Sequence, residues 1–94
     1  MRKIELRIRK AIKAGRWVFT DHAEERLAER GIEEWQVVEG VGPGETLEVH
    51  PESKPHPKVL IRQSLADGST VVTVWAYLKS INSAALITVY FVSR

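Results

Sequence analysis

The sequence predicts an α+β fold, with N-terminal helices packed on one face of a four-stranded antiparallel meander sheet. The period of the apolar residues changes from helical spacing in the first half to strand-like alternation in the second. Gly-Pro-Gly at 42–44 separates the halves. A chain of 94 residues suits one domain. The expected parts are a basic amphipathic helix (1–15), a short strand and two helices (16–44), and the antiparallel sheet (45–94).

The first helix is predicted from a stripe of apolar residues and from a glycine that ends it. Ile4, Ile8 and Ile12 fall on one side of a helix, and Gly15 is a natural C-terminal stop. The run Arg-Trp-Val-Phe-Thr at 16–20 is rich in strand formers, so it is expected as a brief strand or an extended link. We expect the helix to be a peripheral element whose basic side can bind polyanions.

Two further helices are expected before the glycine-rich break. Thr20 or Asp21 can cap the second helix, which stops at Gly31. The third is short and covers 33–40, with Trp35, Val38 and Val41 expected on its inward side.

The second half reads as four strands joined by turns. The Asp-Gly pair at 67–68 is typical of a tight hairpin turn. The expected strands are 45–50, 58–65, 70–78 and 84–92.

The alternation within the last two strands predicts which sheet face the helices cover. We expect aliphatic residues of the strands to be buried beneath apolar residues of the helices: Val72, Val74, Ile87 and Val89 under Ile8, Ile12, Leu27 and Trp35. Thr73, Trp75 and Tyr77 are then expected on the outer face. Such a face can stack bases and bind phosphates, but it is equally an ordinary face of strand-forming residues.

The charges are segregated along the chain although the net charge is only +2. Residues 1–16 carry seven Lys or Arg against one Glu, whereas residues 21–48 carry nine Asp or Glu against two Arg. This asymmetry marks either a face that binds polyanions or two oppositely charged helices that lie near each other.

Composition also limits the chemistry. The absence of cysteine excludes disulfides, thiolate metal sites and Cys nucleophiles. No signal-like N-terminus and no run of about 18 apolar residues is present, so a cytoplasmic protein without a membrane partner is expected. His50 and His56 do not have zinc-type spacing, and the sequence holds neither a nucleophile elbow nor a phosphate-binding glycine loop. No cofactor or metal site is expected.

One constellation on the second helix has chemical potential. His22, Arg26 and Arg30 are spaced i, i+4, i+8 and therefore form one stripe. His22 falls in the first turn, where the helix dipole favours an anion. The alternative is a solvated lattice of salt bridges with Glu25 and Glu29, which contributes little to stability.

The run FTDHAEERLAERGI, the segment LEVHPESKPHPKVLI and the closing ITVY resemble DUF 4258, a family of small prokaryotic domains, over residues 18–91. This resemblance implies the fold of RelE/ParE-like toxins and barnase-like ribonucleases. It implies a toxin-type, metal-independent endoribonuclease that acts on RNA and pairs with a cognate antitoxin protein. By position, the implied catalytic residues are His22, Arg26, Arg30, Thr88 and Tyr90. The alternative is a non-catalytic protein- or nucleic-acid-binding domain.

Overall fold

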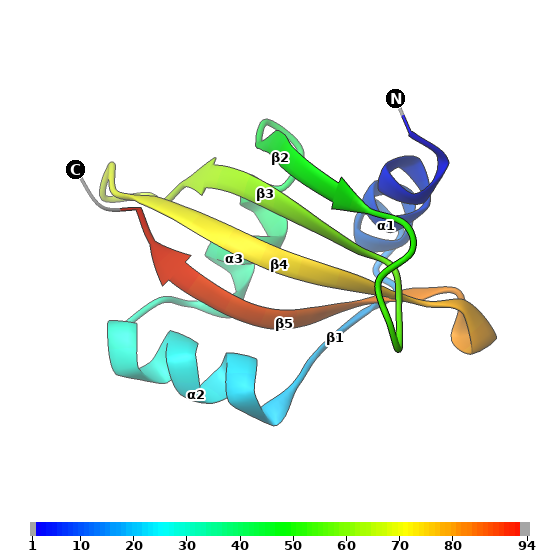
Figure 1. Cartoon of the computed structure of the whole chain (residues 1–94). Coiled ribbons are helices and arrows are strands. Elements are labelled where there is room, and N and C mark those ends of the chain that lie inside the picture. The colour runs from blue at the N-terminus through cyan, green and yellow to red at the C-terminus, as the bar shows by residue number, and fades with distance from the viewer. Residues whose placement is uncertain (1, 93–94) are drawn as a thin grey trace.

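The computed structural model describes residues 2–92 of the chain (Figure 1). In chain order the elements are α1 (Lys3–Lys13), β1 (Trp17–Phe19), α2 (Asp21–Arg30), α3 (Glu34–Gly40), β2 (Glu45–His50), β3 (Lys58–Ser64), β4 (Thr70–Leu78), the short 3-10 helix η1 (Lys79–Ile81) and β5 (Ser83–Phe91). The α+β class is therefore confirmed.

The sheet has five strands in the order β1-β5-β4-β3-β2. Strands β2 to β5 form the expected antiparallel meander. The sheet differs from the expected four-stranded antiparallel meander by one strand. The run at 16–20, expected as a brief strand or an extended link, contains β1, which pairs in parallel with β5 and makes the sheet mixed. A parallel neighbour needs a crossover connection, and α2, α3 and the rest of the sheet lie between these two strands in the chain.

All three helices contribute to one hydrophobic core on one face of the sheet. On α1, Ile8 and Ala11 are fully buried, and Ile12 is nearly so. The expectation that this helix is peripheral was wrong, because its apolar stripe completes the core. Leu27 of α2 is buried as expected.

The inward face of α3 differs from the expectation. Trp35 is 55% exposed, whereas Val37 is fully buried and Val41 nearly so. Val37 and Val41 are spaced i, i+4 and share a face, while Trp35 lies about 200° around the helix from Val37. The placement of Trp35 in the core was therefore wrong.

Strand β4 faces the opposite way from the expectation. Trp75 is fully buried and Tyr77 is 5% exposed, and both belong to the core beneath the helices. Val72 is buried as expected, but it lies outside that core, and Val74 is only half-buried. The hairpin register explains the reversal, because Val72 pairs with Arg62 and shares its face.

A β-bulge in β5 changes the expected alternation. Thr88 pairs with Val74 and Leu86 with Trp75, so Ile87 is the extra residue between them. Leu86 and Val89 both lie in the core. The prediction for Val89 is thus confirmed, whereas that for Ile87 was wrong because the bulge leaves it half-buried.

All three α-helices pack on the face of the sheet that holds the core, and we call the other face the open face. Register places on it residues of the three central strands: Leu60, Arg62, Val72, Val74, Thr88 and Tyr90. Among residues 2–92, none of the helices has the length and apolar character needed to cross a membrane.

Candidate functional site

The first turn of α2 is fixed against β5 by Thr20, which confirms Thr20 as the cap. The Thr20 side-chain oxygen accepts a hydrogen bond from the Ala23 backbone N–H at 3.1 Å. Its hydroxyl lies 3.1 Å from the carbonyl oxygen of Leu86 and 3.2 Å from that of Ile87, and its N–H donates to the former. The helix therefore starts where the pairing of β1 with β5 ends, and α2 lies beside the remainder of β5 (Figure 1).

One flank of α2 faces the second half of β5. Ala23 and Leu27 point into the core. The Arg30 guanidinium lies 5.2 Å from the ring centroid of Phe91, a residue of β5. The opposite flank, with Glu24 and Ala28, instead lines a cleft shared with the start of α3. Arg30 therefore places its end of the predicted stripe beside β5, and by helical spacing Arg26 and His22 turn progressively further toward solvent. We call His22, Arg26 and Arg30 the α2 flank.

The side chains of the α2 flank are largely available to solvent. His22 is exposed, and the structure records no hydrogen bond of its ring among residues 2–92. Arg26 is half-buried, with a guanidinium nitrogen 3.5 Å from a carboxylate oxygen of Glu29. A surface ion pair of this kind contributes about 0–1 kcal/mol, so it holds Arg26 only weakly. Part of the expected salt-bridge lattice is thus present, but it does not occupy His22.

Thr88 and Tyr90 lie on the open face. Thr88 pairs with Val74 and is half-buried, while Tyr90 pairs with Val72 and is 40% exposed. Thr88 and Tyr90 belong to the second half of β5 and face the open side of the sheet. The α2 flank lies on the helix that packs beside this same half of the strand. Among residues 2–92, no recorded hydrogen bond joins the two sets.

The expected outer face of hydroxyl and aromatic residues is instead part of the core. Trp75 donates from its indole nitrogen to the Thr73 hydroxyl at 2.9 Å, and that hydroxyl lies 2.8 Å from the side-chain oxygen of Gln63. The Gln63 amide donates to the Val37 carbonyl at 2.7 Å. These buried polar groups tie α3 to the sheet and leave Tyr90 as the exposed aromatic residue of the open face.

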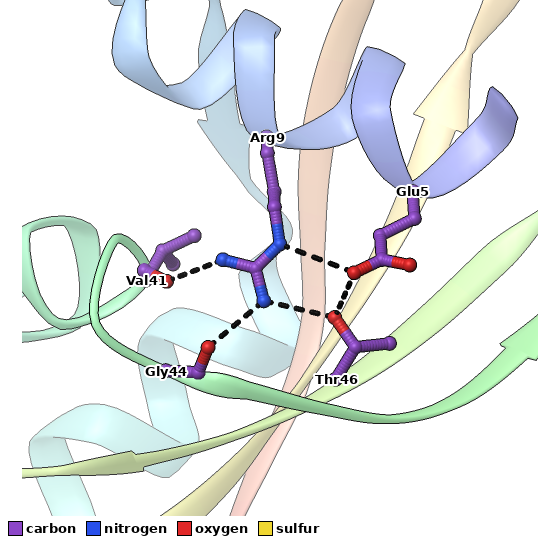
Figure 2. Close-up of polar contacts among 5 residues, drawn as sticks. All are labelled: Glu5, Arg9, Val41, Gly44 and Thr46. Carbon is purple, nitrogen blue, oxygen red and sulfur yellow. Dashed lines mark hydrogen bonds and ion pairs between the residues drawn. The ribbon is translucent and has the colours of Figure 1, made fainter. Parts of the chain in front are cut away.

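Sequence reasoning missed a second polar cluster, which joins α1 to the start of β2 (Figure 2). The Arg9 guanidinium donates to the carbonyls of Val41 at 2.7 Å and Gly44 at 2.9 Å, and to the Thr46 hydroxyl at 2.8 Å. Thr46 in turn donates to a Glu5 carboxylate oxygen at 2.6 Å, which lies 3.5 Å from Arg9 Nε. The available signal was the i, i+4 spacing of Glu5 and Arg9.

Of the two remaining histidines, His50 is the last residue of β2 and His56 lies in the loop that follows it. His50 Nε2 lies 2.8 Å from a carboxylate oxygen of Glu48, and His56 is half-buried. Within the described part of the chain, no three His, Asp or Glu side chains are grouped so that they could hold a metal ion.

These observations define a small α+β domain with helices on one face of its sheet and a stripe of His22, Arg26 and Arg30 on the helix beside the last strand. The model of the family described as "Domain of unknown function (DUF4258)" matches residues 19–91. The chain belongs to the DUF4258 family. Searches of curated proteins and of solved structures gave no match.

Proposed function

We propose that this chain is a metal-independent endoribonuclease of toxin type whose active site is the α2 flank together with Thr88 and Tyr90. The observation that carries the proposal is the contact of Arg30 with Phe91 of β5, on the same helix that presents His22 exposed in its first turn and Arg26 between them. Helices on one face of the antiparallel strands β2 to β5 also agree with the toxin-like fold that the resemblance implies.

In this mechanism the substrate supplies its own nucleophile. His22 takes the proton from a ribose 2′-hydroxyl, or gives a proton to the leaving 5′-oxygen. Arg26 and Arg30 stabilise the charge that develops on the phosphate. Thr88 or Tyr90 orients the phosphate or transfers the complementary proton. The product is a 2′,3′-cyclic phosphate, and DNA is spared because it lacks the attacking hydroxyl.

The test is incubation of the pure protein with total RNA and with single-stranded DNA, followed by analysis of the new ends. We expect cyclic phosphate ends on RNA and intact DNA. The His22→Ala variant should lose cleavage and keep its fold, because an exposed side chain contributes little to packing. His50→Ala is the matched control, since His50 is also exposed and lies outside the proposed site. RNA left whole by the antitoxin-free wild type would refute the proposal.

A second variant tests how phosphate is bound. Arg26→Lys keeps the charge but loses the planar, two-pronged contact with phosphate, so cleavage should fall. Unchanged cleavage by Arg26→Lys would remove Arg26 from the mechanism.

One observation favours a second candidate function, a non-catalytic binding domain. The exposed surface of α2 around the flank is mostly acidic, with Asp21, Glu24, Glu25 and Glu29 exposed. These carboxylates repel a polyanion from the residues that would have to cut it. In this case the wild type would bind a partner protein or nucleic acid and would leave RNA whole. A small adjacent reading frame for a DNA-binding protein would favour the toxin instead.

A further inference from the structure

The solvent-facing side of α1 and its N-cap Arg2 is mostly cationic, with Leu6 as an exposed apolar residue among the charged ones. Its exposed side chains include five Lys or Arg residues: Arg2, Lys3, Arg7, Lys10 and Lys13. We call these five residues the α1 arc. The helix has 3.6 residues per turn, so the five fall within a sector of about 140°. The rest of the circumference faces the core through Ile8, Ala11 and Ile12.

Glu5, the acidic residue of α1, does not compensate this charge. Glu5 turns toward β2, accepts a hydrogen bond from Thr46 and lies beside Arg9. Its side chain is only 13% exposed. Arg9 is likewise occupied with the carbonyls of Val41 and Gly44. The cluster in Figure 2 therefore engages the carboxylate of Glu5, which also lines a cleft with Arg2 at one end of the α1 arc.

The acidic groups elsewhere are also not paired with the α1 arc. The ion pairs recorded among residues 2–92 involve Arg9, Arg26, His50 and Arg62. The acidic residues of α2 and α3 are exposed to solvent. Glu39 of α3 lines the same cleft as Lys13, at one end of the α1 arc, whereas Figure 1 shows α1 and α2 at opposite sides of the molecule. A polyanion is thus attracted to α1 and repelled from α2.

We propose that the α1 arc binds the phosphate backbone of double-helical RNA. The buried stripe and the Arg9 cluster fix α1 to the core. From Lys3 to Lys13 this rigid row extends about 15 Å, since a helix rises 1.5 Å per residue. No aromatic residue lies between Arg2 and Lys13, whereas proteins that bind single strands use aromatic rings to stack the bases. Contacts to phosphates alone, without base stacking, fit a duplex and carry no sequence preference.

The choice of RNA over DNA rests on the proposed function, whereas the backbone contact does not. If the protein cleaves RNA at the α2 flank, the α1 arc holds a helical part of the same molecule at another surface. The arc would raise affinity and set the salt dependence of binding, and it takes no part in the proton transfers.

The test is fluorescence anisotropy with a labelled, blunt-ended RNA hairpin over a series of salt concentrations. The arc variant is Lys3→Gln with Lys10→Gln. The matched control is Lys54→Gln with Lys79→Gln, which removes the same charge from two lysines that are also exposed. Loss of two phosphate contacts should lower the slope of log affinity against log salt by about 2. At about 0.1 M salt this corresponds to a loss of affinity on the order of 50-fold. The control should stay within about twofold.

Several outcomes would overturn the proposal. Equal weakening by the control pair would show that only net charge matters. Tighter binding of a single-stranded RNA of the same length would contradict the preference for a double helix. Tighter binding of duplex DNA would contradict the preference for RNA over DNA. Stronger association with anionic phospholipid vesicles would assign the α1 arc to a membrane surface. Thermal unfolding of both double variants checks that the fold persists.

The two proposals fail in different assays. His22→Ala should keep hairpin binding and its salt dependence, so a loss of both in this variant would contradict separate surfaces. Hairpin binding without any cleavage by the wild type would refute the ribonuclease and leave the backbone contact of the α1 arc standing.

Discussion

Replacing Gly40 with Ala should destabilise the protein through Gln63 alone. Gly40 ends α3 and has no positive φ, so its backbone accepts any residue. A β-carbon at this position would lie 2.5 Å from the Gln63 amide nitrogen, which donates to the Val37 carbonyl in the buried interior. The next atoms lie at 3.4 Å or more, which is ordinary contact. The added methyl group therefore drives the amide from its partner.

The magnitude follows from that hydrogen bond. Gln63 is 3% exposed, so the displaced amide and the Val37 carbonyl have no ready access to water. An unsatisfied buried polar group costs about 1–3 kcal/mol, and we expect Gly40→Ala to cost this much. Gln63→Ala alone should cost about 2–4 kcal/mol, from the lost hydrogen bond and the cavity. In the Gln63→Ala background, Gly40→Ala should be neutral or stabilise by up to about 1 kcal/mol, because alanine favours the helix.

The assay is a double-mutant cycle of urea unfolding at about 25 °C, followed by tryptophan fluorescence. We expect a coupling free energy of about 2 kcal/mol between the two substitutions. Gly42→Ala is the matched control, because a β-carbon there meets no atom within 4 Å. Costs that add within about 0.5 kcal/mol would refute the close approach of Gly40 to Gln63.

Three further expectations concern the polar contacts. Arg9→Met should cost about 3–5 kcal/mol in urea unfolding, because it leaves the mostly buried Glu5 without its cation, and a cost below about 1 kcal/mol would contradict this. Arg30→Gln should cost only about 0.5–1 kcal/mol by loss of the contact with the Phe91 ring, while Arg30→Lys recovers part of it. Hydrogen bonds from Ser69 lower the pKa of Asp67, so the stabilisation they give is present above its unfolded pKa and is lost as pH falls through the folded pKa. Asp67→Asn should accordingly reduce the loss of stability as pH falls below about 4, the ordinary pKa of an aspartate, and an unchanged dependence would refute this assignment.

The order and type of the elements could be predicted because they depend on local signals. The stripe of α1, the Thr20 cap and the Gly31 stop each act within a few residues, and all three are present. The faces of β4 could not be read from β4 alone, because Val72 and Trp75 are both buried.

The missing information lay in the neighbouring strand. The turn at 67–68 sets the register that places Arg62 opposite Val72. A charged side chain on that face marks it as the one that the helices do not cover. The bulge at Ile87 had no comparable signal, since it becomes visible only when β4 and β5 are paired.

The candidate site was predictable in part for the same reason. The spacing of His22 and Arg26 gave their common flank, but not which element lies beside it. The position beside β5 follows from the contacts of Thr20 with Leu86 and of Arg30 with Phe91, which join residues more than 60 positions apart. Residues so distant in the sequence leave no periodic pattern.

The contacts that hold α1 and α2 explain why the two proposed surfaces can be studied separately. The first helix is held by its buried stripe and by Arg9, which reaches the segment before β2. The second is held by Thr20, Leu27 and the end of β5. None of these anchoring residues belongs to the α1 arc, and Arg30 is the one that belongs to the α2 flank. Substitutions at Lys3, Lys10 or His22 therefore alter surface chemistry without releasing either helix, so loss of binding and loss of cleavage report on different groups.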